Sequence, residues 1–260
     1  MKAVVLLPVV PLRAEASDLA EMVSQVLFGE TIEILEQQEK WSHVQCTYDG
    51  YAGWMDNKQF TPLSDEEALE VETWSRIVTD PTISISVSSR IMFGDGKCLA
   101  PILIPMGSRL PQQHRTTIAG ITIEHGLPEP EDTPFITFYR AFQLLNAPYL
   151  WGGKTALGID CSGFTQTVFK TYGIRLLRDA SQQATQGSPV PSVVEAQKGD
   201  LAFFSNPAGR IVHVGIVFGK GIIIHASGKV RIDTLDAQGI YNLDEQRYTH
   251  RLHSIRRISS

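Results

Sequence analysis

Three residues in the second half of the chain have the types and the setting needed for nucleophilic attack on an amide: Cys161, His213 and His225. Attack by cysteine requires a thiolate, an imidazole that takes the thiol proton and later delivers it to the leaving amine, and a polar group that orients the imidazole. We predict that these residues are the nucleophile, the base and the orienting group, in that order. The same residue types could bind zinc, but structural zinc sites need four ligands at short paired spacings, so neither a metal nor a cofactor is predicted.

Cys161 stands where the glycine-rich loop of residues 152–158 is predicted to enter a helix. Unpaired backbone N–H groups and the positive end of the helix dipole favour a thiolate at such a position, which predicts a lowered pKa for this thiol. Cys46 and Cys98 lack this setting and are predicted to be small buried hydrophobic residues. No two cysteines form a CxxC pair, so the chain has no sign of a disulfide framework or a zinc cluster.

The two histidines lie on the two strands of a predicted hairpin with a three-residue turn. The turn is expected to pair Phe218 with Ile222. Counting back along the ladder then sets His225 opposite Gly215. His213 becomes the diagonal neighbour of His225, at roughly 7–8 Å between backbones, so both imidazoles are expected to line one cleft. A slip of one residue would separate them.

The elements that must position these residues form a distinct half of the chain. This half, residues 128–260, is set off by a proline-rich and charged boundary, Gly126–Asp132, after which a helix is predicted from Thr133 and Pro134 to Leu145. A second helix follows Ile159, and alternating strands come last. Helices followed by an antiparallel sheet predict an α+β domain.

The first half of the chain reads as short strands with turn residues between them, including a hairpin turn at Asp49-Gly50. Residues 1–63 are predicted to form one small β-barrel. Residues 64–127 are predicted to form a second barrel together with a linker or short helix at Ser64–Thr73.

Charge separates the two halves. Net charge is −5 over 260 residues, but residues 1–134 carry 9 basic and 20 acidic groups and residues 135–260 carry 14 and 8. This asymmetry argues against a nucleic acid partner for the first half and suits attraction between the halves or a zwitterionic ligand. No uninterrupted apolar run is long enough to span a membrane. The start of the chain reads as a first strand rather than a cleaved signal, which favours the cytoplasm over export.

The second half also resembles the NlpC-type cell-wall cysteine peptidases, which have a minimal papain-like α+β fold. The motifs that carry the resemblance are Pro148-Tyr-Leu-Trp-Gly-Gly153, Asp160-Cys-Ser-Gly163, Leu177-Arg-Asp179, Gly199-Asp-Leu-Ala-Phe-Phe204, His213-Val-Gly215 and His225-Ala-Ser227. The first half resembles bacterial SH3-like modules through Pro11-Leu-Arg-Ala-Glu15 and Tyr48-Asp-Gly-Tyr-Ala-Gly-Trp54. Such modules precede the peptidase domain in the γ-D-glutamyl-L-diamino-acid endopeptidases of murein peptide recycling. The expected fold is thus a papain-like domain preceded by two SH3-like barrels.

The resemblance implies cleavage after D-Glu in L-Ala-γ-D-Glu-diaminopimelate or L-Ala-γ-D-Glu-Lys. It implies that Glu15, Tyr51 and Asp179 hold the free amine of L-Ala. An ammonium in a cleft needs anionic partners, so this agrees with the charge pattern. Glu15 and Tyr51 could equally be a solvated carboxylate and a barrel-surface aromatic residue.

Further family positions surround the predicted cleft. The resemblance implies that Tyr149 assists the Cys161 N–H in stabilising the oxyanion, and that Asp160 and Ser162 bind the D-Glu moiety. Trp151 matches another cleft position. Asp160 could instead serve only as a helix N-cap.

The sequence departs from the γ-D-glutamyl-L-diamino-acid endopeptidases at one position that is expected to contact substrate. Members often have Ser directly after the Asp of the Leu-Arg-Asp motif, but here Ala180 stands there and Ser181 follows.

Two other functions stay open. An exported wall hydrolase would use the barrels to bind intact wall polymer, and an inactive wall-binding protein would have a degenerate peptidase domain. The intact Cys, His and His set argues against the second. The oligomeric state and the third residue of the peptide are not predicted.

Overall fold

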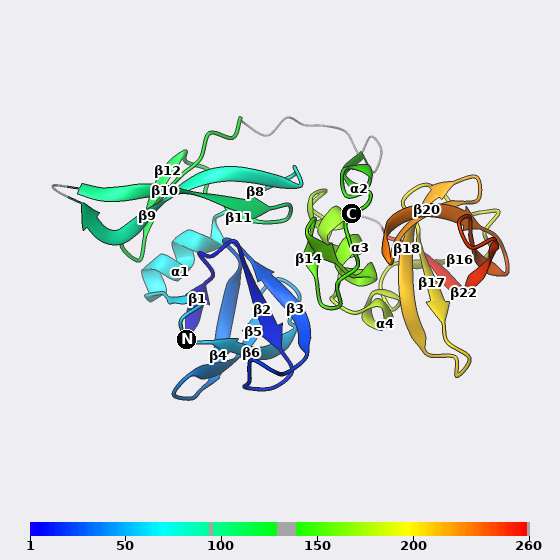
Figure 1. Cartoon of the computed structure of the whole chain (residues 1–260), viewed down its shortest axis with the longest axis horizontal. Helices are drawn as coiled ribbons and strands as arrows, with labels where there is room; N and C mark the ends of the chain where they lie inside the picture. Colours follow the sequence, from blue (N-terminus) through cyan, green and yellow to red (C-terminus); the bar gives the residue numbers. More distant parts are fainter. Residues whose placement is uncertain (94–95, 129–138, 259–260) are drawn as a thin grey trace. The chain divides into compact units, whose positions relative to one another are not determined.

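The computed structural model describes residues 1–93, 96–128 and 139–258, and the backbone alone for residues 89–93 and 96–98. The chain divides into two compact units, Met1–Thr133 and Pro134–Ser260 (Figure 1). The side chain of Cys98, the Gly126–Asp132 boundary beyond Pro128 and the predicted helix start at Thr133 and Pro134 are not among the described parts. None of the helices described is long and apolar enough to cross a membrane.

The first unit begins with a small antiparallel barrel. Its strand order is β3-β2-β6-β5-β4-β1-β7. The strands are β1 Lys2–Val4, β2 Val9–Arg13, β3 Met22–Leu27, β4 Thr31–Gln37, β5 Trp41–Cys46, β6 Ala52–Asp56 and β7 Thr61–Pro62. Alternate residues point inward, among them Leu12, Ile32, Val44 and Met55, which form a buried core.

A short helix, α1 (Asp65–Glu72), leads from this barrel to a second group of strands. The Ser64 hydroxyl accepts from the Glu67 N–H at 3.2 Å and the Glu67 carboxylate accepts from the Ser64 N–H at 2.9 Å. This capping box supplies partners for two end groups of the helix, so the helical alternative for Ser64–Thr73 is confirmed.

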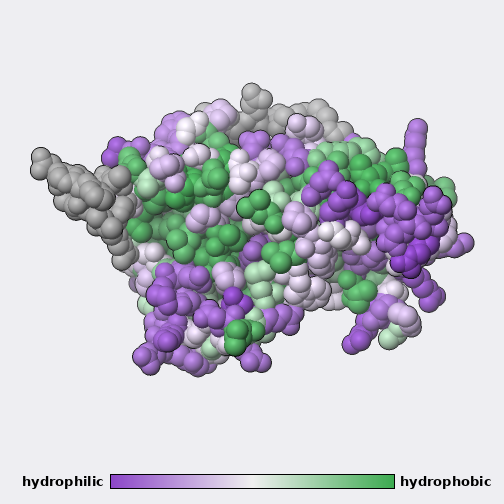
Figure 2. Space-filling model, viewed as in Figure 1, coloured by the Kyte–Doolittle hydropathy of each residue, from purple (hydrophilic) through white to green (hydrophobic). Residues whose placement is uncertain are grey.

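The second group of strands forms two antiparallel sheets. Their orders are β10-β9-β13-β12 and β11-β8. The strands are β8 Arg76–Ile77, β9 Thr82–Phe93, β10 Gly96–Pro105, β11 Arg109–Leu110, β12 Arg115–Ile118 and β13 Ile121–Glu124. One core joins them to the barrel: Phe28 of the barrel clusters with Trp74 and Ile104, all buried. On the face seen in Figure 2, hydrophobic residues gather over α1 and β10, where Leu69 and Leu103 are exposed.

The second unit has helices first and a sheet second, as predicted. The helices are α2 Tyr139–Gln143, α3 Cys161–Lys170 and α4 Ala180–Gln183, and a small hairpin pairs β14 Lys154–Thr155 with β15 Gly158–Ile159. The remaining strands are β16 Ser188–Val190, β17 Leu201–Ser205, β18 Ile211–Gly219, β19 Ile222–Ser227, β20 Lys229–Leu235, β21 Gly239–Asn242 and β22 Arg247–Arg257. Their order is β16-β22-β17-β18-β19-β20-β21, and β22 also pairs with β21, so six strands close into a ring.

Helix α3 is the central helix of this unit. All ten of its residues are buried, and it packs against β18 and β19. Gly173, predicted to end this helix, has a φ of +75° and its N–H donates to the Lys170 carbonyl at 3.0 Å. A residue with a Cβ would be strained at this φ, which explains the glycine.

Candidate active site

Cys161 is the first residue of α3, as the sequence predicted. Asp160 is the N-cap, and its carboxylate accepts from the Gly163 N–H at 2.6 Å. The Val214 N–H also hydrogen bonds to the Cys161 thiol, so this thiol lies against β18 beside His213. The nucleophile and the base strand therefore meet in the second unit.

The prediction of a lowered pKa for Cys161 is wrong. Burial raises the pKa of this thiol to about 12, and the charge of Asp160 adds to the rise. The N–H groups of Val214 and Ser162 act in the opposite direction, but they do not offset the loss of water around a thiol on a residue that is 6% exposed. A thiolate must therefore form by transfer of the proton to a neighbouring base.

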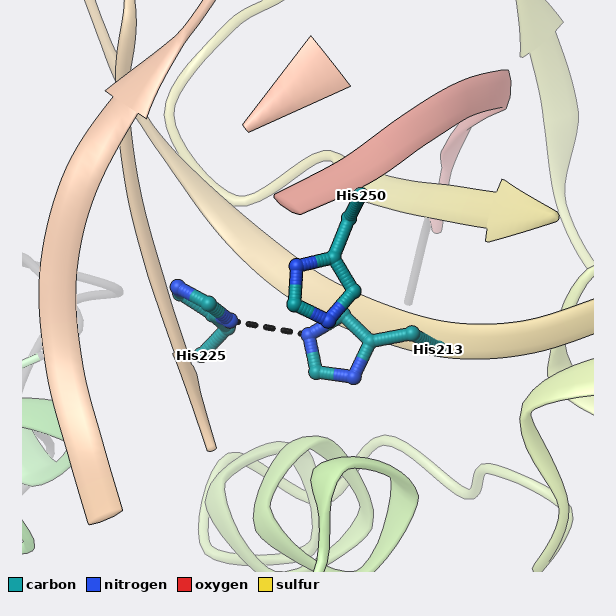
Figure 3. A group of neighbouring side chains, drawn as sticks. All are labelled: His213, His225 and His250. Atoms are coloured by element: carbon teal, nitrogen blue, oxygen red, sulfur yellow. Dashed lines mark hydrogen bonds between the residues drawn. The ribbon is translucent and has the colours of Figure 1, made fainter. Parts of the chain in front are cut away.

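The predicted histidine pair is present. His225 lies opposite Gly215, as counted from the sequence, and the His213 Nε2 and His225 Nδ1 atoms are 2.8 Å apart (Figure 3). Both residues are buried. One detail differs: Gly219, not Phe218, pairs with Ile222, so a bulge takes up one residue next to the turn. The bulge lies beyond the histidines and does not shift their register.

Asp233 holds the other side of His225. This residue of β20 was not predicted from the sequence. Its Oδ2 lies 3.0 Å from the His225 Nε2, and Arg231 contacts the same carboxylate at 2.7 Å and 3.0 Å. The strand pairing could have indicated this residue. His225 lies opposite Arg231 in the ladder of β19 and β20, which makes Asp233 a diagonal neighbour of His225.

His250 of β22 is a second residue that the sequence did not reveal. Figure 3 shows its ring over that of His213. The ligand atoms of His213, His225 and His250 all lie within 4.8 Å of one another, so this is a possible metal-binding group among the described residues. The His213 Nε2 and His225 Nδ1 atoms already share a hydrogen bond, so an ion bound through either of these two atoms would have to displace it.

Tyr149 is half-buried beside the nucleophile. Its backbone bridges to Ile159, two residues before Cys161. Burial raises the pKa of its hydroxyl, and the charges of Cys161 and Asp160 raise it further. The hydroxyl therefore stays protonated and able to donate. Trp151, on the same segment, is 60% exposed.

Asp160 and Ser162 are joined by a buried arginine. Arg178 donates to both Asp160 carboxylate oxygens, at 3.1 Å and 2.6 Å, and to the Ser162 hydroxyl at 2.8 Å. The Asp160 carboxylate also accepts from the Gly152 N–H at 2.8 Å. These contacts give Asp160 a structural role as helix cap, which is the simpler alternative from the sequence, and also as counter-ion of Arg178. That Asp160 and Ser162 bind substrate stays a prediction.

The remaining predicted residues are divided between the units. Asp179 is half-buried at the N-cap of α4, with Ala180 buried and Ser181 exposed after it. Glu15 is exposed in a turn after β2, and Tyr51 is partly buried against the core of the first barrel. Their roles in binding stay predictions.

The arrangement in the second unit can perform nucleophilic attack on an amide. Its residues lie within a segment, 146–257, that matches the model of the NlpC/P60 family, and residues 12–60 match the model of the bacterial dipeptidyl-peptidase SH3 domain. The chain thus carries a bacterial SH3 domain followed in sequence by an NlpC/P60 domain. It is a cysteine peptidase of the NlpC/P60 type.

Curated relatives match most of the chain. A γ-D-glutamyl-L-lysine dipeptidyl-peptidase of Bacillus cereus is 29% identical over 84% of this chain and 72% of its own length. The Bacillus subtilis protein of the same name is 28% identical, over 91% and 81%. Dipeptidyl-peptidase 6 of Lysinibacillus sphaericus is 28% identical, over 92% and 93%.

Solved structures support the fold. An NlpC/P60 family protein from Bacillus cereus has a TM-score of 0.79 at 22% identity, covering 99% of both chains. An NlpC/P60 endopeptidase from Photobacterium damselae has a TM-score of 0.72 at 17% identity, covering 97% of this chain and 70% of the other.

Proposed function

We propose that this cysteine peptidase hydrolyses the bond between γ-D-Glu and a diamino acid in short murein peptides that begin with a free L-Ala. The carrying observation is the hydrogen-bonded pair of His213 and His225 next to the Cys161 thiol. Relatives that are 28–29% identical over most of the chain bear the name γ-D-glutamyl-L-lysine dipeptidyl-peptidase. This name supports the bond type and leaves diaminopimelate and Lys both open for the third position.

In the proposed reaction the Cys161 thiol gives its proton to His213 as its sulfur attacks the D-Glu carbonyl. The Tyr149 hydroxyl and the Cys161 N–H donate to the oxyanion, because charge develops there in the transition state. His213 then protonates the departing amine of the diamino acid. Water hydrolyses the resulting thioester, again with His213 as base.

We propose that Glu15, Tyr51 and Asp179 recognise the L-Ala ammonium. The acidic first half of the chain favours a cationic end of the ligand, and the basic second half favours its carboxylates. Loss of one anionic partner of a desolvated ammonium costs about 2–5 kcal/mol, because the remaining charge is left unpaired. Trp151 and Ser181 are proposed as further substrate contacts on the surface of the second unit.

The direct test is incubation with L-Ala-γ-D-Glu-meso-diaminopimelate and with the Lys peptide, followed by mass analysis. The expected products are L-Ala-D-Glu and the free diamino acid, with none from Cys161→Ala. Cleavage at another bond, or no cleavage of either peptide by folded wild-type chain, would overturn the proposed substrate.

We also propose that the protein recycles free peptides in the cytoplasm. Comparing intact wall with free peptide as substrate, together with fractionation of the producing cells, tests this against an exported wall hydrolase. Preference for intact wall would favour the exported enzyme.

A further inference from the structure

A line of hydrogen bonds leads from a buried carboxylate to the proposed base. The Asp233 Oδ2 lies 3.0 Å from the His225 Nε2, and the His225 Nδ1 lies 2.8 Å from the His213 Nε2. Asp233 is 1% exposed, His225 0% and His213 5%, so bulk water does not compete for these contacts. The direction of each hydrogen bond is therefore set inside the protein.

The donor and acceptor of each hydrogen bond follow from Asp233, because an ionised carboxylate can only accept. Three obligate donors surround its carboxylate: the Arg231 Nε at 2.7 Å, the Arg231 Nη2 at 3.0 Å and the Leu243 N–H at 3.0 Å. Burial alone would raise the pKa of Asp233, but the hydrogen bonds from His225, Arg231 and Leu243 hold it well below its ordinary value. The carboxylate is ionised, and the His225 Nε2 must carry the proton that lies between them.

The direction of the hydrogen bond between His225 and His213 follows because both imidazoles are neutral. Burial lowers the pKa of both His225 and His213 below the usual 6.5. A neutral imidazole has one N–H, so the His225 Nδ1 is an acceptor and the His213 Nε2 must donate to it. The His213 Nδ1 is then left with its lone pair, and in Figure 3 the second nitrogen of His213 points away from His225.

We propose that Asp233 is a positioning residue of the peptidase: through His225 it fixes the tautomer of His213, so that Nδ1 is the atom that takes the Cys161 proton. This inference rests on the proposed function. In the reaction the S–H bond breaks and an N–H bond forms at Nδ1, which gives an imidazolium that keeps its Nε2–H donated to His225. No proton moves on His225 or Asp233, and the new positive charge is stabilised by the Asp233 carboxylate at the end of the line.

Asp233→Asn should reverse the direction of both hydrogen bonds, the one between residue 233 and His225 and the one between His225 and His213. If the new amide NH₂ took the Oδ1 position, it would face two donors, the Arg231 Nη2 and the Leu243 N–H. In the Oδ2 position it faces only one fixed donor, because His225 can switch to accept. His225 would then donate from Nδ1, and the His213 Nε2 would accept. The His213 Nδ1 would carry the proton and could not act as a base.

The first test reads the tautomers without using activity. Long-range ¹H–¹⁵N spectra of the labelled full chain at pH 7 should show His213 and His225 both as Nε2–H tautomers. In Asp233→Asn both should shift to Nδ1–H. A wild-type His213 in the Nδ1–H form would overturn the inference, and this measurement needs no variant to fold.

The second test uses the peptide. Asp233→Asn should lower kcat by at least about 100-fold with KM little changed, since a wrong tautomer removes the base without touching the binding groups. Asp244→Asn is the matched control, because Asp244 contacts Arg231 at 3.0 Å and is exposed. This control should stay within about twofold of wild type.

The activities of Cys161→Ala and Asp233→Asn distinguish failure of the Asp233 role from failure of the proposed function. If Cys161→Ala is inactive and Asp233→Asn cleaves as fast as wild type, the role of Asp233 is overturned and the proposed function stands. If Cys161→Ala cleaves the peptide, the proposed function itself fails. An equal loss in Asp233→Asn and Asp244→Asn would mean that Asp233 acts only by holding Arg231, which also overturns the tautomer role.

Discussion

His250 stacks on His213: the ring centroids are 4.1 Å apart and the planes are inclined by 27°. The His213 ring is in turn nearly perpendicular to that of His225, at 85°. Burial lowers the pKa of His213 and His225, and it lowers the pKa of His250 to about 4. The second unit thus encloses three imidazoles that are neutral at pH 7.

Stability should fall when the solution is acidified from pH 7 to 5. The folded pKa of each of these histidines is below the unfolded value, so the unfolded chain binds more protons in this range and gains free energy. With an unfolded pKa near 6.5, one histidine that stays neutral when folded costs about 2 kcal/mol at pH 5. Urea denaturation at several pH values measures this, and His250→Gln should flatten the dependence. Stability that is constant or rises on acidification would contradict it.

Removing the nucleophile or the base should abolish hydrolysis of the tripeptide while the chain stays folded. Cys161→Ala, Cys161→Ser and His213→Ala are expected to be equally inactive, because the two groups act as one unit. His225→Ala should be milder than His213→Ala, because the base remains. Turnover and circular dichroism of each variant check this, and full activity of Cys161→Ala would exclude it as the nucleophile.

Acetylation of the peptide amine should weaken cleavage by at least ~2 kcal/mol, about thirty-fold in kcat/KM, because it removes the charge that Glu15, Tyr51 and Asp179 are proposed to hold. Glu15→Gln should narrow the gap between free and acetylated peptide, chiefly by slowing the free one. Asp18→Asn, another exposed acid of the same unit, should leave the gap unchanged. Equal cleavage of both peptides would favour an exported wall hydrolase, whose natural stems are acylated.

Chelation should leave activity unchanged, because the proposed chemistry uses no metal. Dialysis against EDTA followed by a turnover assay is the measurement. Activity that falls and returns with added Zn²⁺ would instead assign the histidine group to a metal. His250→Gln, which removes one potential ligand, would then reduce the zinc affinity.

Local features of the site could be predicted from the sequence. The helix start at Cys161 follows from the glycine-rich loop and the capping Asp160, both of which act over a few residues. The pairing of His225 with Gly215 was obtained by counting, and it is right although the turn itself contains a bulge.

The features that were missed depend on distant parts of the chain. The Cys161 thiol has a raised pKa because the surrounding sheet removes its water, and no local pattern reports that burial. His250 reaches His213 because β17 pairs with β22 on one side and with β18, the strand of His213, on the other. Asp233 could have been predicted in part. Extending the count of paired residues from β19 to the next strand, β20, would have placed it diagonally across from His225.

Strand β22 has a further consequence for the integrity of the second unit. It hydrogen bonds to β16, β17 and β21, so it is the element that closes the ring. Proteolytic loss of residues 247–257 would leave β17 and β21 with rows of unpaired backbone groups, which are ready templates for strands of other chains. Trimming at this end should therefore cause aggregation rather than yield a smaller working enzyme.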